Sequence, residues 1–473
     1  NRDAQDSLLP PMAWNAWGDP AAAKPLSAGI RNLLEQALGV TPTEVAAPGI
    51  DEGELASPAL SGQHRDGLSS SIGAAHVRVD HLDRILHAGG KSTPDLLRRK
   101  QIQQDSPDAV LLPGDEDEIA QILAYCTQHG IAVVPFGGGT SVVGGVDPIR
   151  GRFDAVVSLD LRRLDALHWL DEVSGEAELG AGVTGPDAER LLGEHGFSLG
   201  HFPQSFRFAT IGGFAATRSS GQNSAGYGRF NDMIRGLHVV TPAGVLDLGR
   251  APESAAGPDL GELITGEAWS FPDFATGADA LRAVTQTGTG PTVLRLSDEA
   301  ETGVNLATTE SIGEQKITGG CLAITVFEGT AEHAESRHAE TRALLQAHGG
   351  TSLGEGPAKA WEHGRFEAPY LRDALLAGGA LCETLETATT WSNVPTLKSA
   401  VTEALTTALT ESGTPALVMC HISHVYPTGA SLYFTVVAGQ RGDVAEQWRA
   451  AKTAASEAIT RVGATITHHH AVG

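Results

Sequence analysis

Short apolar runs alternate with one-sided helical patterns along the chain from residue 107. An apolar run at 109–113 predicts a buried strand, and a second run at 131–135 predicts another. Between them, residues 115–129 predict a helix that Gly130 ends, with apolar side chains at Ile119, Ile122, Leu123 and Cys126. The order of strand, helix, strand and loop is typical of an α/β half-domain.

The rest of the chain divides into two kinds of region. Up to residue 250 the pattern predicts a helix at 186–194 and strands at 155–159, 167–170, 176–179 and 238–245. From residue 271 it predicts strands at 322–328, 417–421 and 431–437 and helices at 278–287, 331–348, 394–412 and 444–462. Helices that alternate with antiparallel strands predict an α+β second domain.

The N-terminal part has a different residue composition. It combines a Trp/Pro-rich lead, a helical stretch near 30–38 and a Pro/Gly/Ser-rich stretch around 47–71. We interpret residues 1–104 as a helical appendage and linker.

Composition restricts the function classes. With 473 residues, 41% hydrophobic and 19% charged, the chain is expected to fold throughout into two or three domains. The net charge of −24 excludes a general affinity for nucleic acid, so an anionic substrate must meet local arginines. Four cysteines lie far apart in apolar stretches, which predicts reduced thiols: Cys126, Cys321, Cys382 and Cys420. No signal pattern or membrane-length apolar run is visible, so we expect a cytoplasmic protein.

A glycine-rich loop follows the second predicted strand. Its residues are Pro135, Phe136, Gly137, Gly138, Gly139, Thr140 and Ser141. Consecutive glycines leave backbone N–H groups uncovered, which suits a nest around a pyrophosphate. No lysine follows, as a Walker loop would require, and Val142 occupies the final glycine position of G-x-G-x-x-G. Taken alone, these seven residues are equally compatible with a tight connection between strands.

A literal G-x-G-x-x-G occurs at Gly180, Gly182 and Gly185. Asp187 and Glu189 would lie in the first helical turn after it, where they would repel a phosphate. We therefore predict a turn before the 186–194 helix here, and no nucleotide site.

A second polar stretch covers residues 203–228. Its many Gly, Ser and Thr residues cannot build a hydrophobic core, but they can wrap a large polar ligand with backbone and hydroxyl groups. We interpret it as a long cofactor-binding loop.

Together these two stretches resemble alkyldihydroxyacetonephosphate synthases of the vanillyl-alcohol oxidase/para-cresol methylhydroxylase superfamily. The resemblance covers about residues 105–473 and extends to Gly257-Pro258-Asp259-Leu260, Phe271-Pro272-Asp273-Phe274, Leu294-Arg295-Leu296, Gly429-Ala430-Ser431-Leu432-Tyr433-Phe434 and His468-His469-His470-Ala471-Val472-Gly473. It implies an α+β, two-domain flavoprotein. Residues 105–269 would form the FAD-binding domain, residues 270–440 an antiparallel-sheet cap domain for substrate, and residues 441–473 a segment that returns to the FAD domain and active site.

The resemblance also implies an FAD cofactor. Besides the glycine loop, the matching contact residues are Gln204, Ser205, Phe206, Arg207, Phe208, Ala209, Thr210, Gly212, Gly213, Thr217, Arg218, Ser219 and Ser220. Superfamily members that bond FAD covalently through this loop use a histidine, whereas Thr140 is present here. We therefore expect dissociable, non-covalent FAD.

The implied reaction exchanges the acyl group of acyl-dihydroxyacetone phosphate for a fatty alcohol, without net redox change. By resemblance, Tyr433 is the acid/base residue, Arg372 binds substrate, Arg295 is linked to activity, and His468, His469 and His470 form an essential triplet. Each residue also has a purely structural interpretation: Tyr433 could be an aromatic side chain of the core, and Arg372 and Arg295 could form surface ion pairs. A tag remnant is the alternative for the histidines, although a tag would not continue as Ala-Val-Gly.

Two other functions stay open: an FAD-linked oxidoreductase of a 2-hydroxy acid or alcohol, and a catalytically silent flavin-binding protein. Related 2-hydroxyacid dehydrogenases hold a metal through H-x-H and G-E-H-G elements. Because His421 and His424 have the wrong spacing and the triplet lacks a glutamate, we predict no metal. A flavin-contacting segment that the family carries after Glu267 is not found in this sequence. The implied substrate is a small lipid, so a peripheral membrane contact is one alternative that we consider. A homodimer is a second, independent alternative.

Overall fold

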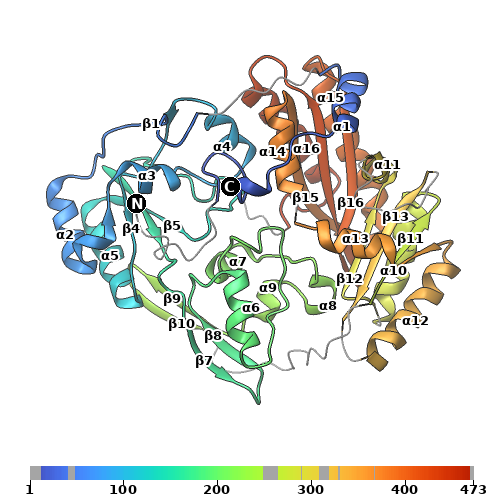
Figure 1. The fold of residues 1–473 in the computed structure, drawn as a ribbon, viewed down its shortest axis with the longest axis horizontal. Helices are drawn as coiled ribbons and strands as arrows, with labels where there is room; N and C mark the ends of the chain where they lie inside the picture. Colours follow the sequence, from blue (N-terminus) through green and yellow to red (C-terminus); the bar gives the residue numbers. More distant parts are fainter. Residues whose placement is uncertain are drawn as a thin grey trace.

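Two β-sheets organise the molecule (Figure 1). The computed structural model describes residues 12–40, 48–248, 265–288, 290–307, 319–328, 331–366 and 368–468. In Figure 1 a four-stranded sheet with its helices lies on the left and a seven-stranded sheet on the right, with the α6–α9 region below and between them. Among the described helices, none is long and apolar enough to cross a membrane.

The four-stranded sheet has the order β2-β4-β6-β5. Its strands are β2 (Val77–Arg78), β4 (Ala109–Leu111), β5 (Ile131–Phe136) and β6 (Ala155–Asp160). β4, β5 and β6 are parallel, and α5 (Glu116–His129) connects β4 to β5. The α5 helix begins after the N-cap Asp115 and ends at Gly130, whose φ is 62°. The predicted strand, helix, strand and loop order is confirmed, and it delivers the glycine loop to the end of β5.

Short elements follow this sheet. They are β7 (Leu167–Asp171), β8 (Glu176–Leu179), α6 (Gly185–Gly193), α7 (Ile211–Thr217), α8 (Ser224–Tyr227), α9 (Phe230–Met233), β9 (Leu237–Thr241) and β10 (Gly244–Leu248). The prediction of one strand at 238–245 is wrong, because residues 242–243 turn the chain into a β9–β10 hairpin. The G-x-G-x-x-G stretch is a turn as predicted, and Thr184 caps α6 with its hydroxyl.

The seven-stranded sheet is antiparallel throughout, with the order β14-β11-β13-β12-β16-β17-β15. Its strands are β11 (Thr265–Phe271), β12 (Val293–Ser297), β13 (Cys321–Phe327), β14 (Thr351–Gly354), β15 (Ala380–Thr390), β16 (Ala416–Tyr426) and β17 (Gly429–Gly439). The associated helices are α10 (Phe274–Thr287), α11 (Glu299–Ala307), α12 (Ala331–Ala347), α13 (Gly356–Gly364), α14 (Ala368–Ala377), α15 (Val394–Glu411) and α16 (Val444–Arg461). We call residues 265–468 the cap.

Side chains alternate between the two faces of the cap sheet. One face packs under α10, α15 and α16 and contributes Leu296, Ile422 and Phe434 to a large core. The opposite face carries Arg295, His421 and Tyr433 toward a cavity. The period of two along each strand therefore places apolar residues in the core and polar residues in one site.

The structure differs from the predicted domain plan at three places. The N-terminal elements are not an appendage: β2 pairs with β4, α2 (Gly62–Ile72) packs on α5, and α1 (Ala28–Leu38) shares a core with α14 and β17. Residues 265–269, assigned to the FAD domain, belong to β11 of the cap sheet. Helix α16 packs against α15 in the cap, and His468, which follows it, accepts a hydrogen bond from Arg229 of the other half.

The remaining N-terminal elements are short. They are β1 (Glu54–Leu55), α3 (His81–Leu86), α4 (Thr93–Arg98), β3 (Gln103–Gln104) and the 3₁₀ turns Pro20–Ala22 and Ala74–His76, with a further 3₁₀ turn at Trp391–Asn393 in the cap.

Candidate active site

A cavity of about 1490 Å³ lies between the two sheets. The glycine loop and the 203–222 stretch form one part of its lining, and the polar face of the cap sheet forms another. Apolar side chains of α1 and α14 complete it, among them Leu33, Leu371 and Leu375. A volume above the usual range for a single small ligand, roughly 300–1,000 Å³, leaves room for a large cofactor together with a substrate.

The glycine loop lies too close to the second stretch to carry side chains. A Cβ atom at Gly138 would overlap the carbonyl oxygen of Phe208, and one at Gly137 would overlap the hydroxyl of Thr210. Gly139 has a φ of 64°, a conformation that glycine adopts without strain. The loop therefore presents bare backbone to the cavity, as a phosphate cradle requires.

Buried polar atoms of the second stretch support a polar ligand. Among the described residues, Gln204 Nε2 and Gln222 Oε1 have no hydrogen-bond partner, although both are buried and both residues line the cavity. Buried polar groups in native proteins nearly always have a partner, so a bound polar molecule is the natural one. Together with the glycine loop, these atoms fit a nucleotide cofactor.

Most of the predicted cofactor residues line the cavity. Phe206, Phe208 and Arg218 do not. Phe208 is buried with its ring 6.0 Å from that of Trp17, and the Phe206 ring lies 6.1 Å from that of Phe366. Arg218 ends α7 in the left-handed conformation, with a φ of 51°. These three residues shape the stretch instead of facing the cavity.

Tyr433 lies at the centre of the polar face of the cap sheet. It is opposite His421 on β16 and opposite Glu386 on β15. Burial raises the pKa of Tyr433 to about 12, so the phenol is neutral at physiological pH. Its contact with polar cavity-lining groups argues against the plain core-aromatic alternative.

Arg295, Glu301 and His421 form one buried network beside Tyr433. Glu301 bonds the His421 Nδ1 atom at 2.8 Å and the Arg295 guanidinium at 2.6 Å. Burial lowers the pKa of His421, and the nearby Arg295 charge lowers it further, which favours a neutral imidazole. Burial alone would raise the pKa of Glu301, but the Arg295 charge and the hydrogen bonds from His421 and Arg295 lower it to about 2. The network holds a neutral imidazole against the Tyr433 ring.

Arg372 lies on α14 and lines the cavity. Its side chain is 11% exposed and pairs with Asp373 at 3.0 Å. Asp373 also accepts a hydrogen bond from the Trp17 backbone N–H, which ties the N-terminal segment to α14. Arg372 is therefore no ordinary surface ion pair but a buried cation at the cavity wall.

His468 is built into the structure. Its side chain is 3% exposed, its Nε2 atom lies 2.7 Å from the Tyr426 hydroxyl, and its Nδ1 atom lies 3.3 Å from Glu386 Oε1. Its carbonyl oxygen accepts a hydrogen bond from Arg229, which contradicts a tag remnant at this position. His469, His470 and the Gly257 to Leu260 motif lie outside the described residues.

Sequence reasoning missed Glu301 and Glu386. Glu386 and Glu383 are the two carboxylates of the largely apolar and hydroxyl-bearing β15, and charged residues inside such a strand were a usable signal. Glu301 lies on a helix start beside two other acidic residues, so nothing local distinguished it.

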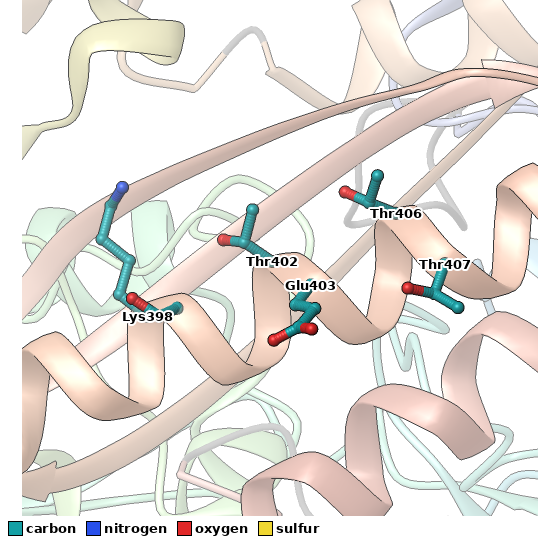
Figure 2. A pocket seen from close by; sticks show the side chains of 6 residues that line it. Lys398, Thr402, Glu403, Thr406 and Thr407 are labelled. Atoms are coloured by element: carbon teal, nitrogen blue, oxygen red, sulfur yellow. The ribbon is translucent and has the colours of Figure 1, made fainter.

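A second hollow, of about 440 Å³, lies along the outer side of α15 (Figure 2). Its labelled side chains come from a single helix: Lys398, Thr402, Glu403, Thr406 and Thr407. Lys398 pairs with Asp298 at 3.1 Å. Because these side chains are spread along one helix and do not converge on a point, we assign no binding or catalytic site to this hollow.

Comparison with known proteins places the chain. Residues 107–249 match the family model described as FAD binding domain, and residues 263–473 match the one described as FAD linked oxidases, C-terminal domain. The chain is 30% identical to alkyldihydroxyacetonephosphate synthase of Trypanosoma brucei brucei, covering 98% of this chain and 86% of that relative. The chain belongs to the alkyldihydroxyacetonephosphate synthase family.

Solved structures agree with this family. A structure of alkyldihydroxyacetonephosphate synthase superposes with a TM-score of 0.84 at 27% identity, covering 96% of this chain and 94% of that one. Para-cresol methylhydroxylase, at 15% identity, shares the fold with a TM-score of 0.60 over 86% of this chain and 88% of its own. The predicted two-domain, vanillyl-alcohol oxidase-type α+β fold is confirmed, and the matching domains identify FAD as the cofactor of this family member.

Proposed function

We propose that this protein is an FAD-dependent alkylglycerone-phosphate synthase. It exchanges the acyl group of acyl-dihydroxyacetone phosphate for a fatty alcohol, a step of ether lipid synthesis without net redox change. The observation that carries the proposal is one cavity that joins a glycine cradle, a neutral half-buried tyrosine, a half-buried arginine and an apolar wall.

The cavity offers a separate place for each part of such a substrate. Arg372 supplies the cation that a phosphate group requires, in a protein whose net charge of −24 otherwise repels anions. Leu33 and Leu375, which belong to the apolar lining, suit an alkyl chain. Arg295 is already paired with Glu301, so it acts as a positioning residue for His421.

Tyr433 is the proton carrier in this proposal. The exchange requires a group that takes a proton from the substrate carbon and returns one. A phenol held neutral by burial can donate its proton to the leaving carboxylate, and the phenolate that forms then takes the proton from the substrate carbon. That proton returns to the carbon, and the phenolate regains its own from the attacking alcohol. The Glu301–His421 pair fixes the ring. FAD, when bound, supplies an electron-deficient ring for the exchange and ends in its starting redox state.

We further propose that FAD is held without a covalent bond. The glycine loop carries Thr140 where covalent members carry histidine. Acid precipitation of the purified protein should leave all flavin absorbance in the supernatant, and flavin in the pellet would contradict this part of the proposal.

The deciding experiment gives the FAD-loaded protein acyl-dihydroxyacetone phosphate and a long-chain alcohol. Alcohol-for-acid exchange without lasting flavin bleaching supports the synthase. A parallel anaerobic sample receives 2-hydroxy acids, and rapid bleaching there without exchange would replace the proposal by an FAD-linked oxidoreductase. If neither reaction occurs, the silent flavin-binding alternative stands.

The proposal extends to the cellular compartment, membrane contact and oligomeric state of the protein. All four cysteines are free and buried, as expected in a reducing compartment, and we propose that the protein works in the cytoplasm. A lipid substrate makes peripheral membrane contact part of the proposal. Co-sedimentation with anionic and neutral vesicles tests that contact, and light scattering tests for a homodimer.

A further inference from the structure

Three side chains from distant parts of the chain meet beside Tyr433. Glu386 comes from β15, His424 from β16, and His468 from the segment after α16. One potential ligand atom of each lies within 4.8 Å of the other two. Glu386 Oε1 lies 3.3 Å from His468 Nδ1 and 3.8 Å from His424 Nε2, and the two imidazole centroids are 5.3 Å apart.

These separations suit a metal ion. Zinc binds histidine nitrogen at about 2.0–2.1 Å and carboxylate oxygen at about 2.0–2.2 Å, so neighbouring ligands of a tetrahedral ion lie roughly 3.4 Å apart. The two measured separations from the Glu386 oxygen lie on either side of this value. The third separation, between the His424 and His468 ligand atoms, is within 4.8 Å, so the two rings would close toward each other on an ion.

Neighbouring groups orient the three side chains. The Tyr426 hydroxyl occupies the Nε2 side of His468 at 2.7 Å, which leaves Nδ1 toward Glu386. Hydroxyls of Ser423 and Ser431 donate to Glu386 Oε1 at 2.5 and 3.1 Å. Such partners hold ligands in place in known metal sites.

The three side chains are shielded from solvent, but the cluster borders the cavity. The side chains of Glu386, His424 and His468 are 1%, 8% and 3% exposed. Glu386 and His424 nevertheless line the cavity. A metal site that accepts an exogenous ligand has three protein ligands and a fourth coordination position that faces a cavity.

In place of the prediction of no metal made from the spacing of His421 and His424, we propose that Glu386, His424 and His468 bind one divalent transition-metal ion of the zinc class at the cavity wall. Two imidazoles and one carboxylate are a nitrogen- and oxygen-rich set that such ions prefer. The occupied site carries a net positive charge, so its open position selects an anionic or carbonyl oxygen. The inference goes beyond the exchange reaction and does not depend on it.

Metal binding by the FAD-loaded full-length chain tests this site without any substrate. The protein is treated with a chelator, dialysed and titrated with Zn²⁺ by calorimetry, and retained zinc is then measured by elemental analysis. We expect about one equivalent. His424→Ala and Glu386→Gln should each weaken binding by at least about 100-fold, while His424→Cys, which keeps a ligand, should retain zinc.

His338→Ala is the matched control, because His338 also pairs with a buried glutamate, Glu267, elsewhere in the cap. It should keep full zinc binding. Flavin absorbance and far-UV circular dichroism verify that each variant is folded. Co²⁺ gives a second readout, since visible bands of tetrahedral cobalt should appear in the unaltered protein and vanish in His424→Ala.

Two outcomes would overturn the proposal: no saturable binding near one equivalent, or the same affinity in His424→Ala and Glu386→Gln as in the unaltered protein. The cluster would then be a hydrogen-bonded group only.

Discussion

The imidazole ring of His421 stacks on the phenol ring of Tyr433, with 4.9 Å between the ring centroids and 17° between the ring planes. The two residues face each other across the β16–β17 pair, so the register of the sheet creates the contact. Glu301 and Arg295 hold the imidazole at its Nδ1 atom. The orientation of Tyr433 on β17 therefore depends on residues from three other elements, β16, α11 and β12.

Replacement of Tyr433 by phenylalanine should abolish the exchange reaction while FAD binding persists. The ring still stacks on His421, but the proton that the reaction needs is gone. A loss of at least 100-fold in kcat is expected, in line with general acid–base contributions of about 10²–10⁴. Tyr125→Phe is the control, because Tyr125 lies on α5 outside the cavity lining. Activity retained by Tyr433→Phe would remove Tyr433 from the mechanism.

Glu301→Gln should destabilise the protein at neutral pH more than at acid pH. The pKa of Glu301 is about 2 in the folded protein and 4.5 for an unperturbed glutamate, so its carboxylate stabilises the fold above pH 4.5. This contribution disappears as the pH falls toward 2. The shift corresponds to roughly 3 kcal/mol at neutral pH. Calorimetry should show a smaller difference in melting temperature between the two proteins at pH 3.5 than at pH 7.

An equal difference at both pH values would mean that the Glu301 charge contributes nothing to stability. Glu403→Gln, on the outer side of α15, is a suitable surface control and should change little at either pH.

Gly138→Ala should greatly weaken FAD binding. The new methyl group would meet the Phe208 carbonyl, so the two cofactor-binding stretches would have to separate. Flavin fluorescence titration of the apoprotein should show at least a tenfold weaker affinity. Gly193→Ala is the matched control, since a Cβ atom there meets nothing within 4 Å. Equal affinities of the two variants would refute the close approach of the stretches.

Arg372→Ala should raise KM for acyl-dihydroxyacetone phosphate more than it lowers kcat. The guanidinium is the buried cation that we assign to the phosphate, and charged hydrogen bonds of this kind contribute about 1.5–3 kcal/mol. Arg372→Lys should recover only part of the loss, because lysine cannot make a two-pronged contact. Unchanged KM in steady-state assays of Arg372→Ala would assign the phosphate to another cation.

The four cysteines should resist alkylation in the native protein. Burial raises the pKa of Cys126 and Cys382 to about 12 and that of Cys420 well above its usual value, so thiolates are scarce at pH 8. Cys321 is equally buried. Thiol titration should give no reaction in buffer and four thiols in denaturant. Rapid labelling of the native protein would contradict the burial.

Several elements could be predicted because their signals are local. Helix α5 begins and ends within one residue of the prediction, since Asp115 and Gly130 are chemical caps. The turn before α6 followed from its proline and acidic residues. The N-terminal region could not be predicted in this way, because Leu68 and Ile72 join the core of the first sheet through contacts with distant residues.

The sequence by itself determined where the glycine loop lies and how the cap strands alternate their two faces, because a run of glycines and a period of two are properties of neighbouring residues. Only the tertiary structure decided which side chains share the site. Tyr433 lies between His421 and Glu386 through an antiparallel register, and His468 joins them after α16 has packed on α15. These contacts depend on strand pairing over long stretches of chain, which no local pattern specifies.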